Sequence, residues 1–262
     1  MAQQKWWGWG DESVAFSHED KPALGPFLER HLGLDVDRIA ARPPAFGQLD
    51  VPEPELGAGL RAALEEAVGP AHVTTDDRER VTHARGKSLR DLVRHRRGEL
   101  GRIPDVVVRP ASEAELEALM AAALDADAVL IPFGGGTNIS GSLEAPAHES
   151  RPVVSVDMER MDRVLEVDAA SQLARVQAGV FGPRLEAQLN ARGWTAGHFP
   201  DSFTHSTLGG WIATRSSGIQ SDKYGDVSDL TRAVRVVTPA GVLSTRPVPH
   251  KSPKKGCTRL PG

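Results

Sequence analysis

A run of three glycines, residues 134–136, is the feature of this sequence best suited to chemistry. It stands in the stretch IPFGGGTNISGSL, directly after an apolar run. Glycines leave consecutive backbone N–H groups uncovered and able to turn toward one point, as is needed to wrap the oxygens of a diphosphate. Thr137, Asn138 and Ser140 add side-chain donors. We therefore predict a nucleotide diphosphate site here, although an ordinary tight turn would carry the same glycines.

The spacing of these glycines does not fit the common dinucleotide fingerprint. That fingerprint has glycines at its first, third and sixth positions, whereas Gly134 and Gly136 are followed by Ile139 at the sixth. The sequence therefore does not favour a classical nicotinamide site.

An incomplete phosphate-binding loop lies upstream, where Gly86, Lys87 and Ser88 resemble the end of a P-loop. The first glycine of that motif would fall at Val81, so the motif fails. Because the surrounding residues 75–100 are rich in charged side chains, we expect a solvated helix there instead.

The stretch GHFPDSFTHSTLGGWIATRSSG, residues 197–218, is the second candidate site. It combines many hydroxyl groups with small residues, and Gly209 and Gly210 would let a ring or a strand approach closely. A Ser/Gly-rich surface loop would have the same composition. Trp211 and Ile212 favour a stretch that turns inward, because large apolar side chains are normally buried.

A strand–helix–strand pattern positions the glycine-rich stretch. The β-branched residues 106–108 predict a strand, and Ser112 and Glu115 have capping-box spacing at the start of a helix that we expect to end near Asp125. A second strand is expected at residues 128–132. Such a βαβ unit places the glycines at the carboxyl end of a strand, where ligands usually bind in α/β sheets.

The remaining pattern predicts one helix on each side of this unit and several short strands. Residues 56–68 repeat leucine or valine every four positions, and residues 183–192 form a second helical pattern. Short apolar runs at 153–156, 164–167 and 173–177 suggest an antiparallel meander. Residues 233–243 read as a hairpin around Pro-Ala-Gly.

Composition excludes several classes of protein. The chain has 262 residues, 40% hydrophobic content and a formal net charge of -4, with no basic stripe, so we expect a globular protein that binds no nucleic acid. It shows no apolar run long enough to span a bilayer and no signal-peptide pattern, so we expect a cytoplasmic location. Cys257 is the only cysteine, and no His/Asp cluster has ligand spacing, so no metal site is predicted.

Four segments together resemble the FAD-binding domain, of the PCMH type, of the vanillyl-alcohol-oxidase superfamily. They are PDVVVRPASEAELEALM, IPFGGGTNISG, VQAGV and PDSFTHSTLGGWIATRSSG, in the order and spacing of that family. Within it the chain most resembles the alkyldihydroxyacetonephosphate synthases and their bacterial homologues. With these it shares the opening KWWGWG and the stretch SDKYGDVSDLTRAVRVVTPAGV.

The resemblance implies an FAD cofactor and assigns residues to it. The diphosphate would be held by Pro132, Phe133, Gly134, Gly135, Gly136, Thr137 and Asn138. The flavin would be lined by Pro200, Asp201, Ser202, Phe203, Thr204, His205 and Ser206, and the middle of the site by Ala213, Thr214, Arg215 and Ser216. The glycine-rich stretch has no histidine where covalently flavinylated relatives carry one, which implies noncovalent FAD. His198 is the single catalytic candidate, although a lone histidine is more often structural.

The implied fold is α+β, with two α+β subdomains in an FAD-binding domain over residues 101–249 and a helical lead-in over residues 1–100. The family continues after Pro249 with a glycine-rich segment and a cap domain, whereas here residues 250–262 have four basic and no acidic side chains. We therefore expect the second subdomain to be incomplete, the tail to be aberrant or disordered, and these residues alone to bind FAD weakly or not at all and to lack activity.

Three functions stay open on the sequence. The resemblance favours a flavin-dependent transferase that exchanges the acyl group of acyl-dihydroxyacetone phosphate for a fatty alcohol, which implies a lipid-phosphate substrate and peripheral membrane contact. A second candidate is an FAD-linked oxidoreductase of a 2-hydroxy acid or an alcohol. The third is a noncatalytic, truncated product. The oligomeric state does not follow from the sequence.

Overall fold

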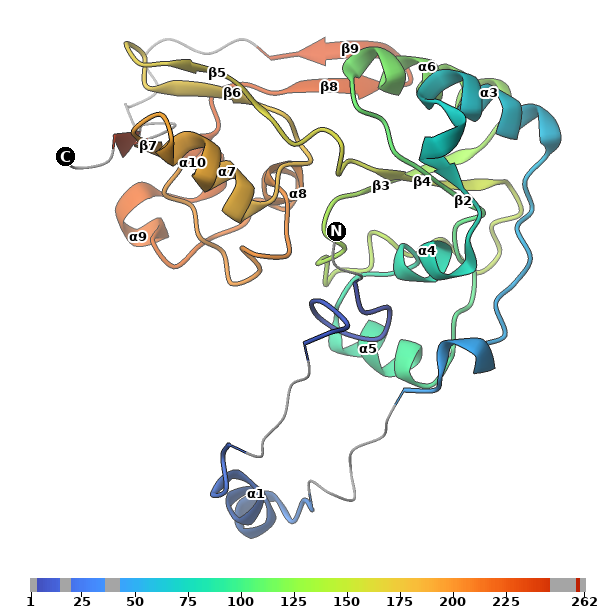
Figure 1. The fold of residues 1–262 in the computed structure, drawn as a ribbon, viewed down its shortest axis with the longest axis vertical. Helices are drawn as coiled ribbons and strands as arrows, with labels where there is room; N and C mark the ends of the chain where they lie inside the picture. The colour runs from blue at the N-terminus through green and yellow to red at the C-terminus, as the bar shows by residue number, and fades with distance from the viewer. Residues whose placement is uncertain (1–3, 15–19, 36–42, 246–257, 260–262) are drawn as a thin grey trace.

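The computed structural model of the 262-residue chain describes residues 4–14, 20–35, 43–245 and 258–259. Its helices are α1 (Leu24–Leu32), α3 (Ala58–Val68), α4 (Asp77–Thr82), α5 (Leu89–Arg96), α6 (Glu113–Asp125), α7 (Gly182–Asn190), α8 (Leu208–Thr214), α9 (Ser221–Tyr224) and α10 (Val227–Leu230), with short 3-10 turns at Phe46–Gln48 and Pro70–His72. The strands are β1 (Val73–Thr74), β2 (Val106–Val108), β3 (Val129–Phe133), β4 (Val153–Asp157), β5 (Val164–Asp168), β6 (Leu173–Val176), β7 (Trp194–Thr195), β8 (Arg235–Thr238), β9 (Gly241–Ser244) and β10 (Thr258–Arg259). They form two subdomains that lie side by side (Figure 1).

The first subdomain is built on a four-stranded sheet in the order β1-β2-β4-β3. Strand β4 runs parallel to both β2 and β3, and β1 is antiparallel to β2. Helices α3 and α6 pack on one another and cover one face of the sheet, whereas α4 and α5 lie on the other side (Figure 1). The core joins Leu64 of α3 to Val106, Leu119 and Val154. Helix α3 and strand β1, which lie in the expected lead-in, thus share the core of this subdomain.

The antiparallel meander expected for residues 153–177 is wrong in its first strand. All five residues of β4 are buried, and the strand lies between β2 and β3 with parallel pairing. A strand buried on both faces reads as a continuous apolar run, which cannot be told from a hairpin strand by its pattern alone. Only β5 and β6 form the expected antiparallel pair.

The local signals for α6 are confirmed. The Ser112 hydroxyl accepts a hydrogen bond from the backbone N–H of Glu115 at 3.2 Å, which caps the helix. The Glu115 carboxylate accepts from the N–H of Ala111 at 2.8 Å, so the second half of the capping box reaches one residue further back than expected. Helices α3 and α7 and the hairpin of β8 and β9 also form where the sequence predicts them.

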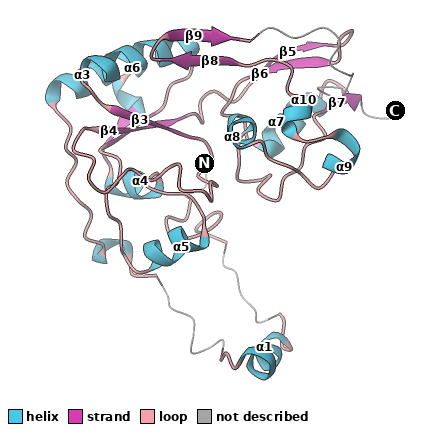
Figure 2. Ribbon diagram, turned by 180° about the vertical axis from the view of Figure 1, so that it is seen from behind, coloured by secondary structure: helices cyan, strands magenta, loops and turns pink. Residues whose placement is uncertain are grey.

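The second subdomain carries antiparallel hairpins and short helices, so the α+β class is confirmed. Its core packs Leu185 and Leu189 of α7 against Trp194 and Trp211. The hairpins β5–β6 and β8–β9 lie next to each other above these helices in both views (Figure 2). The two hairpins are separate two-stranded sheets.

The prediction of a solvated helix within residues 75–100 is wrong for most of that stretch. Two separate short helices form, and Arg85, Lys87, Asp91 and His95 are buried. The Arg85 guanidinium lies against the carbonyls of Glu99 and Leu100, which compensate the loss of water.

Helix α1 stands apart from both subdomains and buries none of its residues (Figure 1). Within the described ranges, no helix is long and apolar enough to cross a membrane. The expected aberrant tail lies outside the described residues except for β10, which pairs antiparallel with β7.

Candidate cofactor site

The glycine loop, residues 132–138, leaves the carboxyl end of β3 and packs directly on the second subdomain. A Cβ on Gly134 would stand 2.3 Å from the Thr207 hydroxyl, and one on Gly135 would stand 1.7 Å from the His205 carbonyl oxygen. Gly136 has φ +67 and lies on the ring of Phe133. The space that a side chain would need is filled by protein, so the glycines are required by the contact between the two subdomains as well as by their conformation.

The amides of this loop fit a phosphate ligand. Among the described residues, the backbone N–H groups at positions 134–138 have no hydrogen-bond acceptor in the protein. Gly135 and Gly136 are nevertheless buried. Buried N–H groups are almost always paired, and a run of them beside a positive φ is a typical anion site. The loop therefore fits the diphosphate of FAD.

Asn138 shapes the loop instead of offering its side chain as a donor to a ligand. Its side-chain oxygen accepts from the N–H groups of Ser140 and Ser142 at 3.0 and 3.1 Å, and its amide nitrogen donates to the Ser140 hydroxyl. Phe133 is buried beneath the loop and Pro132 is exposed. The backbone amides, and not these three side chains, are placed to bind a cofactor.

The flavin segment, residues 200–206, forms two consecutive turns that begin at Pro200. Phe203 N–H donates to the Pro200 carbonyl and His205 N–H to that of Ser202, both at 2.8 Å. The ring of Phe203 stacks on Trp211 at an angle of 16°. Asp201 and Thr204 are exposed at the outside of the turns. The segment is thus held from below by an aromatic core.

Ser206 is the polar centre of this segment. Its hydroxyl accepts from Trp211 Nε1 at 2.6 Å and from Ser202 Oγ at 2.9 Å, and it donates to the Ser202 carbonyl at 2.8 Å. It is 4% exposed, and its backbone lies against Gly135 of the glycine loop. The hydroxyl therefore fixes the segment at the point where the two subdomains touch.

Replacing Ser206 by alanine is expected to lower the free energy of unfolding by about 1–3 kcal/mol, because the buried Trp211 N–H loses its acceptor. Ser202→Ala is the matched control, since it leaves that acceptor in place and should cost roughly 1 kcal/mol or less. Urea unfolding followed by tryptophan fluorescence measures both. Equal stability of the two variants would show that Ser206 has no such role.

His198 lies in the core of the second subdomain. Its Nε2 contacts the Ser216 hydroxyl at 2.8 Å, its ring packs edge-on against Trp211 at 5.2 Å, and it is 3% exposed. Burial lowers the pKa of His198, and the carboxylate of Asp226 opposes this. In this arrangement the imidazole orients Ser216, and a substrate role for His198 stays a prediction.

Residues 213–216, which the resemblance assigns to the middle of the FAD site, do not stay together in the structure. Ala213, Thr214 and Arg215 are exposed at the end of α8, and their described hydrogen bonds stay within this helix. Arg215 ends the helix with φ 53. Only Ser216 turns inward, to His198. The structure therefore joins the glycine loop to the flavin segment but does not bring these three residues to the loop.

An ionic network supports the glycine loop from below, at the carboxyl ends of β2 and β4. His83 Nε2 lies 3.0 Å from the Asp157 carboxylate, and its ring packs on Phe133 with the centroids 4.0 Å apart. Arg109 Nε lies 2.8 Å from Glu159, and its guanidinium also contacts Glu79. Burial, with Asp157 close by, raises the pKa of Glu159. The network fixes Phe133 and through it Gly136.

Two parts of the site were missed by sequence reasoning. A Cβ on Gly86 would stand 1.8 Å from the Asn138 carbonyl oxygen, and the N–H of Lys87 donates to that oxygen at 2.7 Å. Burial lowers the pKa of Lys87 to about 8, and the Asp91 carboxylate opposes this. The available signal was Gly86 shortly before Ser88, with Asp91 three positions after that serine. This spacing is typical of a helix start, so it predicts that residues 86–88 form a tight turn into α5.

The second missed part is the N-terminal turn, residues 5–10, which reaches the flavin segment at His205. The available signal was the presence of three tryptophans and two glycines within six positions.

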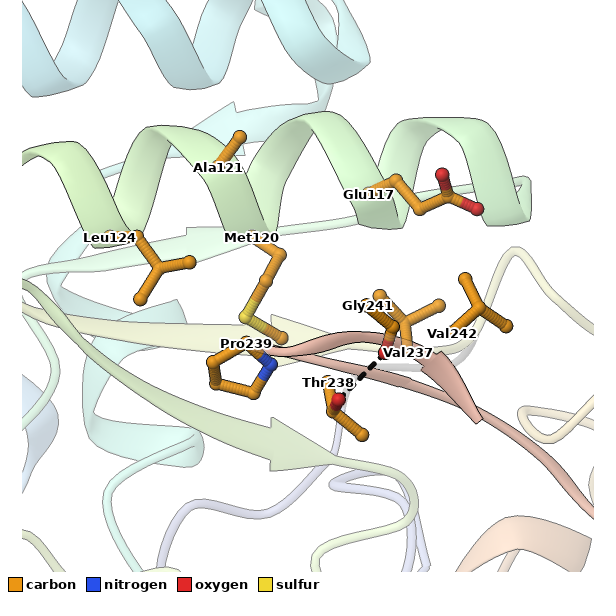
Figure 3. Close-up of a pocket in the computed structure, with 9 residues that line it drawn as sticks. All are labelled: Glu117, Met120, Ala121, Leu124, Val237, Thr238, Pro239, Gly241 and Val242. Carbon is orange, nitrogen blue, oxygen red and sulfur yellow. Dashed lines mark hydrogen bonds between the residues drawn. The ribbon is translucent and has the colours of Figure 1, made fainter. Parts of the chain in front are cut away.

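Two surface hollows accompany the site. One of about 380 Å³ opens between the start of α5 and the residues that follow the glycine loop, with Arg90, Gly141 and Glu144 in its wall. The other, of about 240 Å³, lies between α6 and the hairpin of β8 and β9 (Figure 3). Met120 and Pro239 point into it, and its rim contains no group that the glycine loop contributes.

Known proteins were found that resemble the chain over almost its full length. It is 41% identical to alkyldihydroxyacetonephosphate synthase of Dictyostelium discoideum over 267 residues, which span 93% of this chain and 43% of that protein. A solved alkyldihydroxyacetonephosphate synthase superposes with a TM-score of 0.84 and 38% identity, covering 97% of this chain and 49% of that one. The chain thus spans less than half the length of these relatives.

A different class of enzyme matches a shorter stretch. D-2-hydroxyglutarate dehydrogenase of Pantoea ananatis is 36% identical over 152 residues, which cover 56% of this chain and 14% of that protein. Residues 104–245 match the family described as FAD binding domain. This range contains both the glycine loop and the flavin segment. The chain is therefore a member of the FAD-binding-domain family, with homology to the alkyldihydroxyacetonephosphate synthases.

Proposed function

We propose that this chain holds FAD noncovalently between its glycine loop and its flavin segment, as the cofactor-binding part of an enzyme of the alkyldihydroxyacetonephosphate synthase type. The observation that carries the proposal is the run of amides at positions 134–138, which have no acceptor within the described ranges of the chain and lie where the loop meets His205. The 41% identity to a synthase supports the type of enzyme.

The chain supplies binding, orientation and shielding. The loop amides donate hydrogen bonds to the two phosphates, and the buried Ser206 hydroxyl keeps the flavin segment rigid. Phe203 and Trp211 exclude water from below the segment. When bound, FAD supplies the flavin ring at which the acyl group of acyl-dihydroxyacetone phosphate would be exchanged for a fatty alcohol.

The test of FAD binding is gel filtration and equilibrium dialysis of the purified chain with added FAD. The sequence led us to expect weak or absent binding, but the glycine loop and the flavin segment both lie in the described part of the chain and touch each other, so under this proposal we expect flavin to travel with the protein. Acid precipitation should then release all of it into the supernatant, as expected for noncovalent FAD. Protein that elutes without flavin and shows no saturable binding would overturn the proposal. Flavin that stays in the acid pellet would overturn its noncovalent part.

An FAD-linked oxidoreductase of a 2-hydroxy acid is the second candidate, favoured by the similarity to D-2-hydroxyglutarate dehydrogenase. The two reactions differ at the flavin, because only a dehydrogenase reduces it. Bleaching of the flavin absorbance by D-2-hydroxyglutarate without oxygen would support the dehydrogenase. Incorporation of a labelled fatty alcohol into an ether product, with unchanged flavin colour, would support the synthase.

A further inference from the structure

The N-terminal turn, residues 5–10, is built into the first subdomain. Its ends are joined by a hydrogen bond from the N–H of Lys5 to the carbonyl of Gly10 at 2.9 Å. Trp6 is 1% exposed and packs with Val81 and Ile103. Truncating a fully buried indole is among the costliest changes to a protein core. The turn is therefore fixed, although it lies at the start of the chain.

Three side chains from residues 87–96 hold the carbonyl groups of this turn. Lys87 Nζ donates to the carbonyl of Lys5 at 3.3 Å, and His95 Nδ1 contacts that of Trp6 at 2.7 Å. Arg96 Nε donates to the carbonyl of Trp7 at 3.4 Å. These side chains face one edge of the turn and leave the other edge to the second subdomain.

The opposite end of the turn meets the flavin segment. The Trp9 indole and the His205 imidazole have their centroids 6.1 Å apart, and a Cβ on Gly10 would stand 3.5 Å from His205 Cε1. On its other side, His205 presents its carbonyl to Gly135. His205 is thus enclosed between the N-terminal turn and the glycine loop, and the Trp9 side chain remains partly exposed there.

Lys87 connects the two structures that enclose His205. Its backbone N–H donates to the carbonyl of Asn138 in the glycine loop, and its ammonium group donates to the carbonyl of Lys5 in the turn. One residue therefore fixes the distance between the loop and the turn. The backbone link survives any side-chain substitution, so the two functions of Lys87 can be separated.

We infer that the N-terminal turn forms a wall of the FAD site, in which Trp9 makes aromatic contact with the bound cofactor and Lys87 is a positioning residue that holds the turn to the glycine loop. This inference rests on the proposed function. A partly exposed indole beside the flavin segment offers a flat apolar face, and aromatic ring pairs gain free energy beyond the area that they bury.

The test measures FAD affinity and flavin fluorescence in the full 262-residue chain. Trp9→Ala is expected to raise the Kd for FAD roughly 5-fold, by the loss of about 1 kcal/mol of aromatic contact, and Trp9→Phe to restore most of the affinity. Trp7→Ala is the matched control from the same turn and should leave the Kd within about 2-fold, since Trp7 contacts Trp6 instead of His205.

Flavin fluorescence supplies a readout that a structural role alone would not change. Indole in contact with the flavin ring quenches its emission, so bound FAD should be brighter in Trp9→Phe than in the wild type and unchanged in Trp7→Ala. Lys87→Met should weaken FAD binding to a similar extent as Trp9→Ala. The Lys87→Met/Trp9→Ala double variant should have about the same Kd for FAD as whichever single variant binds FAD less tightly, because both changes act on one contact.

The outcomes separate this inference from the proposed function. A wild-type chain that binds no FAD would overturn both. FAD binding by the wild type, together with an unchanged Kd and unchanged flavin emission in folded Trp9→Phe and Trp9→Ala, would overturn only the role of the turn. If the losses of FAD-binding free energy in the two single variants add up in the double variant, Lys87 does not act through the Trp9 contact, and its role as a positioning residue would be overturned.

Discussion

Replacing Gly135 by alanine is expected to weaken FAD binding by at least about 100-fold, because the two subdomains cannot keep their contact. The new Cβ would stand 1.7 Å from the carbonyl oxygen of His205 and 3.1 Å from the Cα of Ser206, both of them backbone atoms. The glycine loop must therefore move. Losing two hydrogen bonds to phosphate costs about 3–6 kcal/mol, and the lower end of this range already corresponds to a rise in the Kd for FAD of about 100-fold. Equilibrium dialysis with FAD measures it.

Gly141→Ala is the control from the same stretch of chain. Gly141 has φ +81, but a Cβ added there would have no neighbouring atom within 4 Å, so the variant bears only the backbone strain of a positive φ, about 1–2 kcal/mol. We expect a lower melting temperature and an FAD affinity close to that of the wild type. If Gly135→Ala bound FAD within about 3-fold of the wild type, the loop would not be the diphosphate site.

Replacing Asp105 by alanine is expected to lower the free energy of unfolding by about 3–5 kcal/mol, since it leaves a partly buried arginine without its partner. Asp105 is 0% exposed and accepts two hydrogen bonds from Arg102, at 2.9 and 2.6 Å. It also accepts from the N–H groups of Val153 at 2.7 Å and Glu55 at 2.9 Å. The carboxylate thus joins the residues just before β2, the start of β4 and the segment before α3.

Glu65→Ala is the control for Asp105→Ala. Glu65 pairs with Arg61 at 2.9 Å on the surface of α3, so its loss should cost about 0.5 kcal/mol or less. Guanidinium unfolding of both variants and the wild type gives the comparison. Equal losses would mean that burial of the Asp105 pair has no effect.

The contribution of Asp105 also has an expected pH dependence. Burial opposes its ionisation, but the hydrogen bonds from Arg102, Val153 and Glu55 outweigh burial and lower the pKa of the carboxyl. A group whose folded-state pKa is lowered stabilises the protein above its unfolded pKa, about 4 for aspartate, and loses this effect as the pH falls through the folded value. The difference in the free energy of unfolding between the wild type and Asp105→Ala should therefore become smaller only below about pH 4.

Local features of the fold were predictable because their causes lie within a few residues. Ser112 starts α6 through a hydrogen bond to Glu115, three positions on. The turn from Thr238 to Gly241 closes the β8–β9 hairpin with adjacent residues, and Gly241 takes φ +108. The position of the glycine loop after β3 follows from the strand–helix–strand pattern in the same way.

Long-range features were not predictable, since charge and hydropathy do not say which distant groups a segment meets. Residues 75–100 look solvated because they are charged, yet Lys87 and His95 are buried against carbonyls of Lys5 and Trp6, more than 80 positions away. Likewise, five buried residues in β4 fit a hairpin strand as well as a central parallel strand. Its partners on both sides decided the choice.

The sequence by itself determined the α+β class of this protein and the position of the glycine loop after a strand, because both follow from short runs of residue types with a local conformational cause; the roles of the loop and of residues 200–206 in binding FAD stay predictions. Only the tertiary structure decided that the glycines of the loop fit against His205 and Thr207, that Ala213, Thr214 and Arg215 stay exposed, and that Trp9 reaches the site. These depend on contacts between parts of the chain that sequence spacing does not relate, and their free energy comes from packing and desolvation after the subdomains meet.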